Sequence, residues 1–312
     1  MVEVGYDIGL GRLTHIRLKM LSIFPELLRQ YRETTNKDPR TKDWFLLQDN
    51  PFPVWILTAL YLGFVYVGPK VMKDRKPFDL RWLMVIYNLS LVGLSVYMFL
   101  EILLGVLDAN YDLLCAKFDK ESWADPKERR IANVLWWYFI SKAIELNDTV
   151  LMILRKKFNQ VTFLHWFHHA TMLNIWWWVM MFIGGGQCWF GSCLNCLVHV
   201  AMYSYYGLSA IPALKGKLWW KKYITRFQLI QFCCTLSHTL SGFYRGCGYP
   251  MWGQHLLAWY MVLMLILFAN FYIHEYIKRK NERSLKHNKE NGVDHSLNGY
   301  VNGTIEKKAK LH

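Results

Sequence analysis

Three histidines lie close together in the middle of the chain, within a run rich in Phe, Leu, Met and Trp. They are His165, His168 and His169. On a helix, positions i, i+3 and i+4 share one face. Polar groups at membrane depth are costly and usually face a bundle interior or a wet cavity. A neutral imidazole can act as a nucleophile, a general base or a metal ligand near pH 7. The pattern therefore predicts a buried polar site.

Three further apolar stretches carry polar or aromatic side chains at helical spacing. Their members, in chain order, are Lys142, Glu145, Asp148 and Thr149; Asn195, His199, Met202, Tyr203 and Tyr206; and Gln228 and Gln231. Each stripe alone has a structural explanation: an ion pair that neutralises itself, a hydrogen-bonded core histidine, or glutamines that join helices. Together with the histidines they occupy four consecutive apolar segments, which favours one shared polar interior.

Two kinds of chemistry fit such an interior. Membrane di-iron desaturases and hydroxylases use several histidine clusters, whereas this chain has one cluster and otherwise isolated histidines. The seven cysteines include no C-x-x-C pair with a second pair or with histidines at zinc spacing. We therefore favour acyl chemistry without a metal or a cofactor, in which an imidazole is the nucleophile or the base.

The composition indicates an integral membrane protein. Of 312 residues, 53% are hydrophobic and 16% aromatic, and the net charge is +14. The mean hydropathy of +0.08 averages very apolar segments with polar ends. The basic residues fall in short loops between apolar runs and form no continuous patch, which argues against nucleic-acid binding. The chain has no N-terminal signal-peptide pattern, so internal segments are expected to direct insertion.

We predict an all-α, polytopic membrane protein with seven transmembrane helices. The apolar segments are 53–71, 82–106, 131–153, 162–183, 188–210, 225–244 and 254–277. Each is near the ~20 residues that cross a ~30 Å hydrocarbon core. Residues 51–277 would form the membrane domain. Residues 1–50 would form an amphipathic lead-in that lies on the membrane or caps the bundle, and 278–312 a disordered tail.

Loop charges predict the orientation. Basic clusters follow the first, third, fifth and seventh segments. In a seven-span arrangement all four lie on one side, which the positive-inside rule makes the cytosol, together with the C-terminus. The basic N-terminal region argues the other way, but long terminal regions constrain orientation less. Lys308 and Lys310, fifth and third from the end, fit a signal for retrieval to the endoplasmic reticulum membrane.

Two cysteines lie in the loops predicted to be luminal. Cys115 lies between the second and third segments, and Cys247 between the sixth and seventh. An oxidising compartment would permit a disulfide between them. Two unpaired thiols remain the alternative, because sequence does not supply the distance between their Cα atoms.

The four stripes, taken together, resemble the very-long-chain fatty acid elongase family. The resemblance runs from about Trp44 to Tyr276, and it is strongest to the animal elongases that act on polyunsaturated chains. The motifs, in order, are Lys142-x-x-Glu145-x-x-Asp148-Thr149, His165-x-x-His168-His169, Asn195-x-x-x-His199-x-x-Met202-Tyr203-x-Tyr205-Tyr206 and Thr225-x-x-Gln228-x-x-Gln231-Phe232.

The resemblance implies a fold, an activity and partners. The last six helices would form a barrel around a tunnel for the acyl chain. The activity would be the condensing step of chain elongation: a 3-oxoacyl-CoA synthase joins a long, polyunsaturated acyl-CoA to malonyl-CoA and releases CO2 and CoA. The partners would be both thioesters and the lipid bilayer. The reductases and dehydratase of the elongation cycle and a second copy of the chain are further candidate partners, and the sequence does not determine the oligomeric state. Basic loop residues such as Lys221 and Lys222 would attract the CoA phosphates.

Two mechanisms and one different function stay open. Either His165 attacks the thioester, or His199 does so with His165 assisting, to give an acyl-imidazole; the alternative is a one-step condensation with histidine only as base. Asn195, His168, His169 or Lys142 would stabilise the enolate, and Glu145 and Asp148 would orient imidazoles. The substrate-binding set would be Thr149, Met202, Tyr203, Tyr206, Gln228, Gln231, Lys221 and Lys222. A lipid or ion transporter is less favoured, since no inverted repeat is apparent.

Overall fold

The computed structural model describes residues 37–48, 50–214 and 216–278. Most of the predicted N-terminal lead-in, residue 215 and the tail with Lys308 and Lys310 therefore lie outside the described residues. In the described part, seven long helices are present and no strand. They are α2 (Phe52–Met72), α3 (Arg81–Asp108), α4 (Pro126–Leu154), α5 (Phe163–Phe182), α6 (Cys188–Ala210), α7 (Lys221–Arg245) and α8 (Met251–Tyr272). Each predicted apolar segment is a helix, so the all-α prediction is confirmed.

Three of these helices are long and apolar enough to cross a membrane. They are α2, α3, and α8 with the π-helical turn η4 (Ile273–Lys278) up to Ile277. The other four, α4 to α7, contain the polar stripes, which lower their hydropathy. The chain is thus a multi-pass membrane protein by the composition of its helices.

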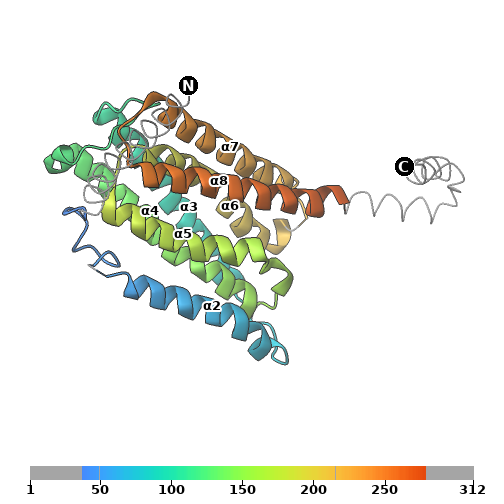
Figure 1. Ribbon diagram of the computed structural model, residues 1–312. Helices are drawn as coiled ribbons and strands as arrows, with labels where there is room; N and C mark the ends of the chain where they lie inside the picture. Colours follow the sequence, from blue (N-terminus) through green and yellow to red (C-terminus); the bar gives the residue numbers. More distant parts are fainter. Residues whose placement is uncertain (1–36, 49, 215, 279–312) are drawn as a thin grey trace, which may run out of the picture. The chain divides into compact units, whose positions relative to one another are not determined.

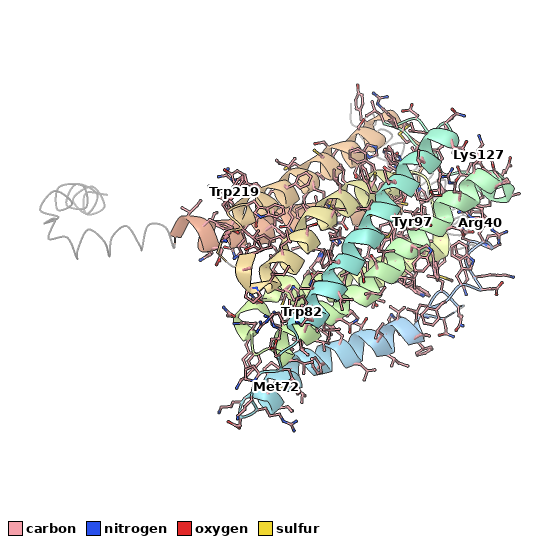
Figure 2. The ribbon with its side chains drawn as sticks, turned by 180° about the vertical axis from the view of Figure 1, so that it is seen from behind. Arg40, Met72, Trp82, Tyr97, Lys127 and Trp219 are labelled. Atoms are coloured by element: carbon pink, nitrogen blue, oxygen red, sulfur yellow. A yellow bond between two sulfur atoms is a disulfide. The ribbon has the colours of Figure 1, made fainter. Side chains whose placement is uncertain are left out.

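The described residues divide into two units, one that ends at Met264 and one that begins at Leu265. Within the first unit, α3 packs along α6 and α4, α4 packs on α5, and α6 packs on α7. Helix α2 packs against α4 and α5 (Figure 1). Helix α4 is therefore central, with α2, α3 and α5 against it. Lys127 and Arg40 lie at one end of this unit, and Met72 and Trp82 lie at the other (Figure 2).

The buried face of α4 changes from apolar to polar along its length. Asp125 caps the helix, because its side chain accepts a hydrogen bond from the Lys127 amide, and Pro126 follows at a position where no N–H is needed. Ile131, Leu135 and other apolar side chains then fill the core. The next buried positions on this face carry the predicted stripe from Lys142 to Thr149. The same packing that buries the apolar half therefore buries the polar half.

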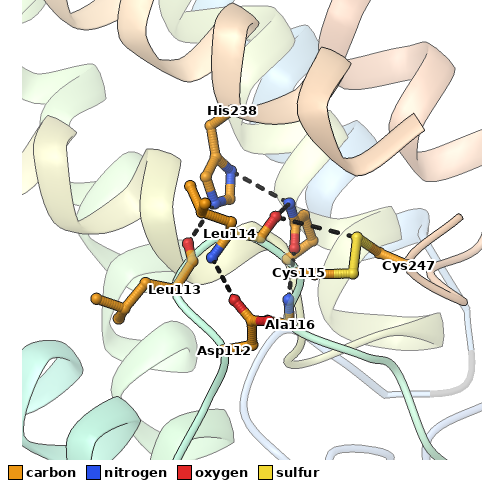
Figure 3. The surroundings of a disulfide bond; sticks show 8 residues. Asp112, Leu113, Leu114, Cys115, Ala116, His238 and Cys247 are labelled. Carbon is orange, nitrogen blue, oxygen red and sulfur yellow. Dashed lines mark hydrogen bonds between the residues drawn. A yellow bond between two sulfur atoms is a disulfide. The ribbon is translucent and has the colours of Figure 1, made fainter. Parts of the chain in front are cut away.

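A disulfide joins two loops at the end that holds Lys127. Cys115, after α3, is bonded to Cys247, after α7, with their Cα atoms 5.2 Å apart. Figure 3 shows how neighbouring groups hold the same loop. The His238 ring Nε2 lies 2.9 Å from the Leu113 carbonyl oxygen, and the Ala116 amide donates to Gln187 Oε1 at 2.9 Å. The α3–α4 loop is thus fastened to α6 and α7.

The segment before α2 docks at this end too. Thr41 donates its hydroxyl to the Met180 carbonyl at 3.0 Å. Arg40 and Asp38 form an ion pair of 2.6 Å whose side chains are 5% and 0% exposed. Arg40 also donates to the carbonyls of Glu128 at 3.1 Å and Gly184 at 3.2 Å. These bonds fix the chain entering α2 to α4 and to the end of α5.

Candidate active site

The polar stripe of α4 contains a fully buried ion pair. The Lys142 ammonium lies 2.8 Å from Glu145 Oε1, and both side chains are 2% exposed. Ser141 donates its hydroxyl to the same oxygen at 3.1 Å. The ammonium also lies 4.3 Å from the centre of the Tyr138 ring. A buried charge is tolerated only when it is paired and hydrogen-bonded, and here both charges are.

Helix α6 extends this pair into a network across helices. Asn195 Oδ1 accepts from Lys142 Nζ at 3.2 Å, and its amide nitrogen faces Gln231 Oε1 on α7 at 3.5 Å. One turn further along α6, His199 Nδ1 lies 3.4 Å from Glu145 Oε1. The Lys142–Glu145 pair therefore does more than neutralise itself, because it contacts an amide and an imidazole of another helix.

Asp148 is held between two tyrosines. Tyr87 on α3 donates its hydroxyl to Asp148 Oδ1 at 2.7 Å, and Tyr203 on α6 donates to Oδ2 at 2.9 Å. His169 Nε2 lies 3.9 Å from Oδ2, beyond hydrogen-bond distance but close enough for an electrostatic interaction. The two hydroxyls thus fix the carboxylate beside the histidine motif.

His165, the first histidine of the motif, contacts α4 at Thr149, the residue after Asp148. His165 Nε2 lies 2.9 Å from Thr149 Oγ1, and Thr149 Oγ1 lies 2.8 Å from the Tyr61 hydroxyl on α2. At the start of α5, the side chain of Thr162 accepts a bond from the His165 amide at 3.3 Å, which caps the helix. The motif therefore starts in the first turn of α5, where the cap fixes its orientation.

The three imidazoles of the motif lie near one another but have different partners. The ring centres of His165 and His169 are 4.6 Å apart, and those of His168 and His169 are 5.6 Å apart. His168 Nδ1 lies 3.3 Å from the Tyr260 hydroxyl on α8, and that hydroxyl lies 2.9 Å from Thr171 Oγ1. His168 thus faces α8, whereas His165 and His169 face α4.

His165 and His199 approach the same face of α4 from two helices. Their α4 partners, Thr149 and Glu145, are four residues apart, which is about one helical turn. Two imidazoles of different helices are therefore presented to one polar face at adjacent turns. This arrangement suits a reaction in which one imidazole attacks and the other moves a proton.

The remaining predicted substrate-binding residues lie in different surroundings. Gln228 Nε2 lies 3.7 Å from the Met202 sulfur, and the Tyr206 ring centre lies 6.1 Å from that of Tyr203. Lys221 and Lys222 are exposed in the first turn of α7. Ten residues separate Lys221 from Gln231, or about 15 Å along the helix. The structure thus joins Gln231 to the buried network and leaves both lysines at the helix end.

Four tyrosines of the site were not predicted, Tyr260 on α8 and the three that contact α4 or α6. Tyr138 donates its hydroxyl to Asn195 Oδ1 at 2.6 Å, and its position four residues before Lys142 is a signal that could have found it. Tyr61 and Tyr87 lie on α2 and α3 among apolar neighbours, and nothing in their spacing distinguishes them from core or lipid-facing tyrosines. Only the packing of those helices on α4 brings their hydroxyls to Thr149 and Asp148.

An apolar groove lies beside the histidine motif. It has a volume of about 450 Å³ and is lined by side chains of α5 and of the first part of α8. Phe167, Trp178 and Leu256 supply apolar walls, while Tyr260 and Thr171 supply the polar groups nearest His168. The groove could take a hydrocarbon chain whose polar end points to the imidazoles.

No set of three or more His, Cys, Asp or Glu side chains is placed to hold a metal ion within residues 37–48, 50–214 and 216–278. Both carboxylates of the network already accept hydrogen bonds, Glu145 from Lys142 and Asp148 from Tyr87 and Tyr203. The buried network thus consists of hydrogen-bonded imidazoles, a lysine–glutamate ion pair and a carboxylate held by two tyrosines.

The comparisons with known proteins show the family of the chain. Residues 46–284 match the family described as "ELO: GNS1/SUR4 family". Very long chain fatty acid elongase 5 of Rattus norvegicus is 46% identical over 268 residues, which cover 85% of this chain and 88% of the relative. Very long chain fatty acid elongase 4 of Mus musculus is 42% identical over 297 residues, covering 93% and 94%. Very long chain fatty acid elongase 2 of the same organism is 44% identical over 275 residues, covering 88% and 93%. The predicted family resemblance is confirmed, and the chain belongs to the GNS1/SUR4 family, the family of these elongases.

Proposed function

We propose that this protein is a 3-oxoacyl-CoA synthase that condenses a long-chain acyl-CoA with malonyl-CoA. The product would be two carbons longer, and CO2 and CoA would be released. One observation carries the proposal: His165 and His199 meet adjacent turns of a buried polar face on α4, through Thr149 and Glu145. The names of the relatives, which are all fatty acid elongases, support the choice of reaction.

In the first half-reaction, a nitrogen of His165 attacks the thioester carbon. The carbon–sulfur bond breaks, CoA leaves as a thiolate that takes up a proton, and an acyl-imidazole remains. His199 is suited to accept and return the proton. Its Nδ1 faces the Glu145 carboxylate, which favours the tautomer with hydrogen on Nδ1 and leaves a lone pair on Nε2.

In the second half-reaction, malonyl-CoA loses CO2 and becomes an enolate. The enolate carbon attacks the acyl carbonyl, the bond to the imidazole breaks, and the imidazole nitrogen takes up a proton, which regenerates neutral His165. Loss of CO2 supplies the carbanion, so no strong base is required. The Asn195 amide, the Lys142 ammonium, His168 or His169 would donate to the enolate oxygen.

The membrane arrangement is also part of the proposal. All seven helices would cross the bilayer, and the last six would form a barrel around the acyl tunnel. Lys221 begins α7, and the disulfide cysteine Cys247 follows its end, so the basic mouth for CoA and the disulfide lie at opposite ends of a helix about 37 Å long. The basic end would face the cytosol with the C-terminus, and the disulfide end would face the oxidising lumen.

The proposal also covers the location and the partners of the protein. Lys308 and Lys310, in the part of the chain outside the described residues, would be read as a retrieval signal to the endoplasmic reticulum. The product of the condensation must next be reduced and dehydrated, so enzymes of those classes are the expected partners. Assembly with a second copy of the chain is part of the same proposal.

A direct assay tests the proposed reaction. Purified protein would be incubated with radiolabelled malonyl-CoA and a panel of acyl-CoAs that differ in length and number of double bonds. We expect labelled 3-oxoacyl-CoA, formed with the highest kcat/KM from long polyunsaturated chains. A folded protein that forms no product with any acyl-CoA would overturn the proposal and favour a transporter.

A further inference from the structure

The carboxamide of Asn195 is bonded differently at its two ends. The oxygen accepts two hydrogen bonds from α4, from the Tyr138 hydroxyl at 2.6 Å and the Lys142 ammonium at 3.2 Å. An ammonium group can only donate. The atom of Asn195 that faces Lys142 must therefore be the oxygen, and the amide nitrogen must lie on the other side of the group, toward Gln231.

Tyr138 is built into the core so that its hydroxyl cannot move far. The side chain is 2% exposed, and its ring packs edge-to-face on Trp176 with centres 4.5 Å apart. The Lys142 ammonium lies over the ring at 4.3 Å. Lys142 divides its donors between Asn195 and Glu145. The Tyr138 hydroxyl has one hydrogen and gives it to Asn195 at the shorter distance.

The amide nitrogen of Asn195 has more donor hydrogens than acceptors in the described part of the chain. It has two N–H bonds, and within the described part of the chain it contacts one acceptor, Gln231 Oε1, at a long 3.5 Å. His199 follows one turn later on the same face of α6. A second N–H is thus available on the helix face that also carries His199, whose imidazole faces Glu145.

We propose that Tyr138 is a positioning residue for the condensation. It holds the Asn195 oxygen so that the amide N–H, and not the carbonyl oxygen, points to the oxygen that becomes negative in the reaction. A carboxamide that turned freely would often present its oxygen and repel that charge, whereas a fixed donor stabilises it without reorganisation. This inference rests on the proposed synthase function.

The test is the variant Tyr138→Phe, which removes only the hydroxyl and keeps the ring between Trp176 and Lys142. We expect kcat for condensation to fall about 10- to 100-fold, the effect of misplacing one catalytic donor. The KM values for both thioesters should change less than about twofold, since the lost contact acts in the transition state. Tyr111→Phe is the matched control, because it also removes a tyrosine hydroxyl bond to a side-chain acceptor, the 2.7 Å bond to the half-buried Glu128, and should leave kcat unchanged.

A double-mutant cycle separates positioning from a general loss of structure. If Tyr138 acts through Asn195, then Tyr138→Phe combined with Asn195→Ala should be no slower than Asn195→Ala alone. The inference would be overturned if the two single losses of kcat multiplied in the double variant, or if folded Tyr138→Phe kept the kcat of the wild type. In either case an active wild-type enzyme would still uphold the synthase function. An inactive folded wild type would overturn both.

Asn195→Asp extends the test to the case in which Tyr138→Phe does not fold. Aspartate can still accept from Tyr138 and Lys142 but has no amide N–H. We expect it to be as slow as Asn195→Ala, and a kcat near that of the wild type would overturn the inference.

Discussion

Glu145 is the residue on which the buried network converges. A single oxygen, Oε1, accepts from Lys142 and Ser141 and faces His199. Its negative charge balances the Lys142 ammonium and selects one tautomer of the imidazole. Removing either partner would leave an unpaired charge in the core, which costs more than the pair itself contributes. The residue therefore couples the stability of the bundle to the protonation of the site.

Asp148 offers a test of this coupling at the second carboxylate. The change Asp148→Asn keeps the shape of the side chain, but an NH2 group takes the place of one of the two oxygens that accept from tyrosine hydroxyls. The change also removes the negative charge beside His169. We expect a loss of about 1–3 kcal/mol in the free energy of unfolding, as for a disrupted buried hydrogen bond. We also expect kcat to fall about 10-fold or more. Thermal unfolding and the condensation assay measure the two effects.

The control for that change lies one residue earlier. Asn147 is exposed, and its side chain bonds only back to the Ile144 carbonyl within the described residues. Asn147→Ala should change both stability and kcat little. Asp148→Asn with wild-type unfolding and wild-type kcat would show that the carboxylate is not part of the machinery.

Spacing on single helices predicted much of the candidate site. The pairs Lys142–Glu145 and Asn195–His199 lie on the faces that a 3.6-residue period gives. Spacing could not show that Tyr87 reaches Asp148 from α3, because the register between two helices depends on how whole side-chain surfaces pack. It also placed Gln228 with Gln231, whereas only Gln231 reaches Asn195 in the structure.

At the scale of elements, α4 positions the site because three helices pack on it. Its polar second half contacts α2 through Tyr61, α3 through Tyr87 and α5 through His165, and His199 of α6 faces Glu145 in the same half. Hydropathy predicted that each long helix exists and nearly where it begins. It could not distinguish a membrane span from a buried helix for α4 to α7, since the polar stripes that carry the chemistry also lower the apolar signal.

The docked segment before α2 depends on one glycine at the end of α5. Gly184 has φ of +55°, and a Cβ there would lie 2.7 Å from Asp38 Oδ2. Gly184→Ala should therefore cost about 1–3 kcal/mol through backbone strain and displacement of the Asp38–Arg40 pair. Thermal unfolding in detergent measures it.

Gly63 is the matched position for that experiment. It lies inside α2 with nothing within 4 Å of an added Cβ. Gly63→Ala should be neutral or stabilise by about 0.5–1 kcal/mol, because alanine favours the helix. Equal changes in the free energy of unfolding at the two glycines would contradict the docking of the segment before α2.

At the scale of the whole molecule, the disulfide closes a long covalent loop. Cys115 and Cys247 are 132 residues apart in sequence, and the loop between them includes α4 to α7. Cys115→Ser with Cys247→Ser should lower stability by about 2–4 kcal/mol, mainly because the unfolded chain gains freedom. Each single change should match the double change. Cys233→Ser, at an exposed free cysteine, should change stability little. A loss of stability there as large as in the double variant would contradict the assignment of the disulfide to Cys115 and Cys247.

The central claim is that a histidine of the buried network carries the acyl group. Intact-protein mass spectrometry after addition of acyl-CoA alone tests it most directly. We predict a mass increase equal to the acyl group, mapped to His165, lost on addition of malonyl-CoA and absent in a folded, inactive His165→Ala variant. An enzyme that makes 3-oxoacyl-CoA but shows no acyl adduct at any time before malonyl-CoA is added, or a His165→Ala variant with near-normal activity, would contradict it.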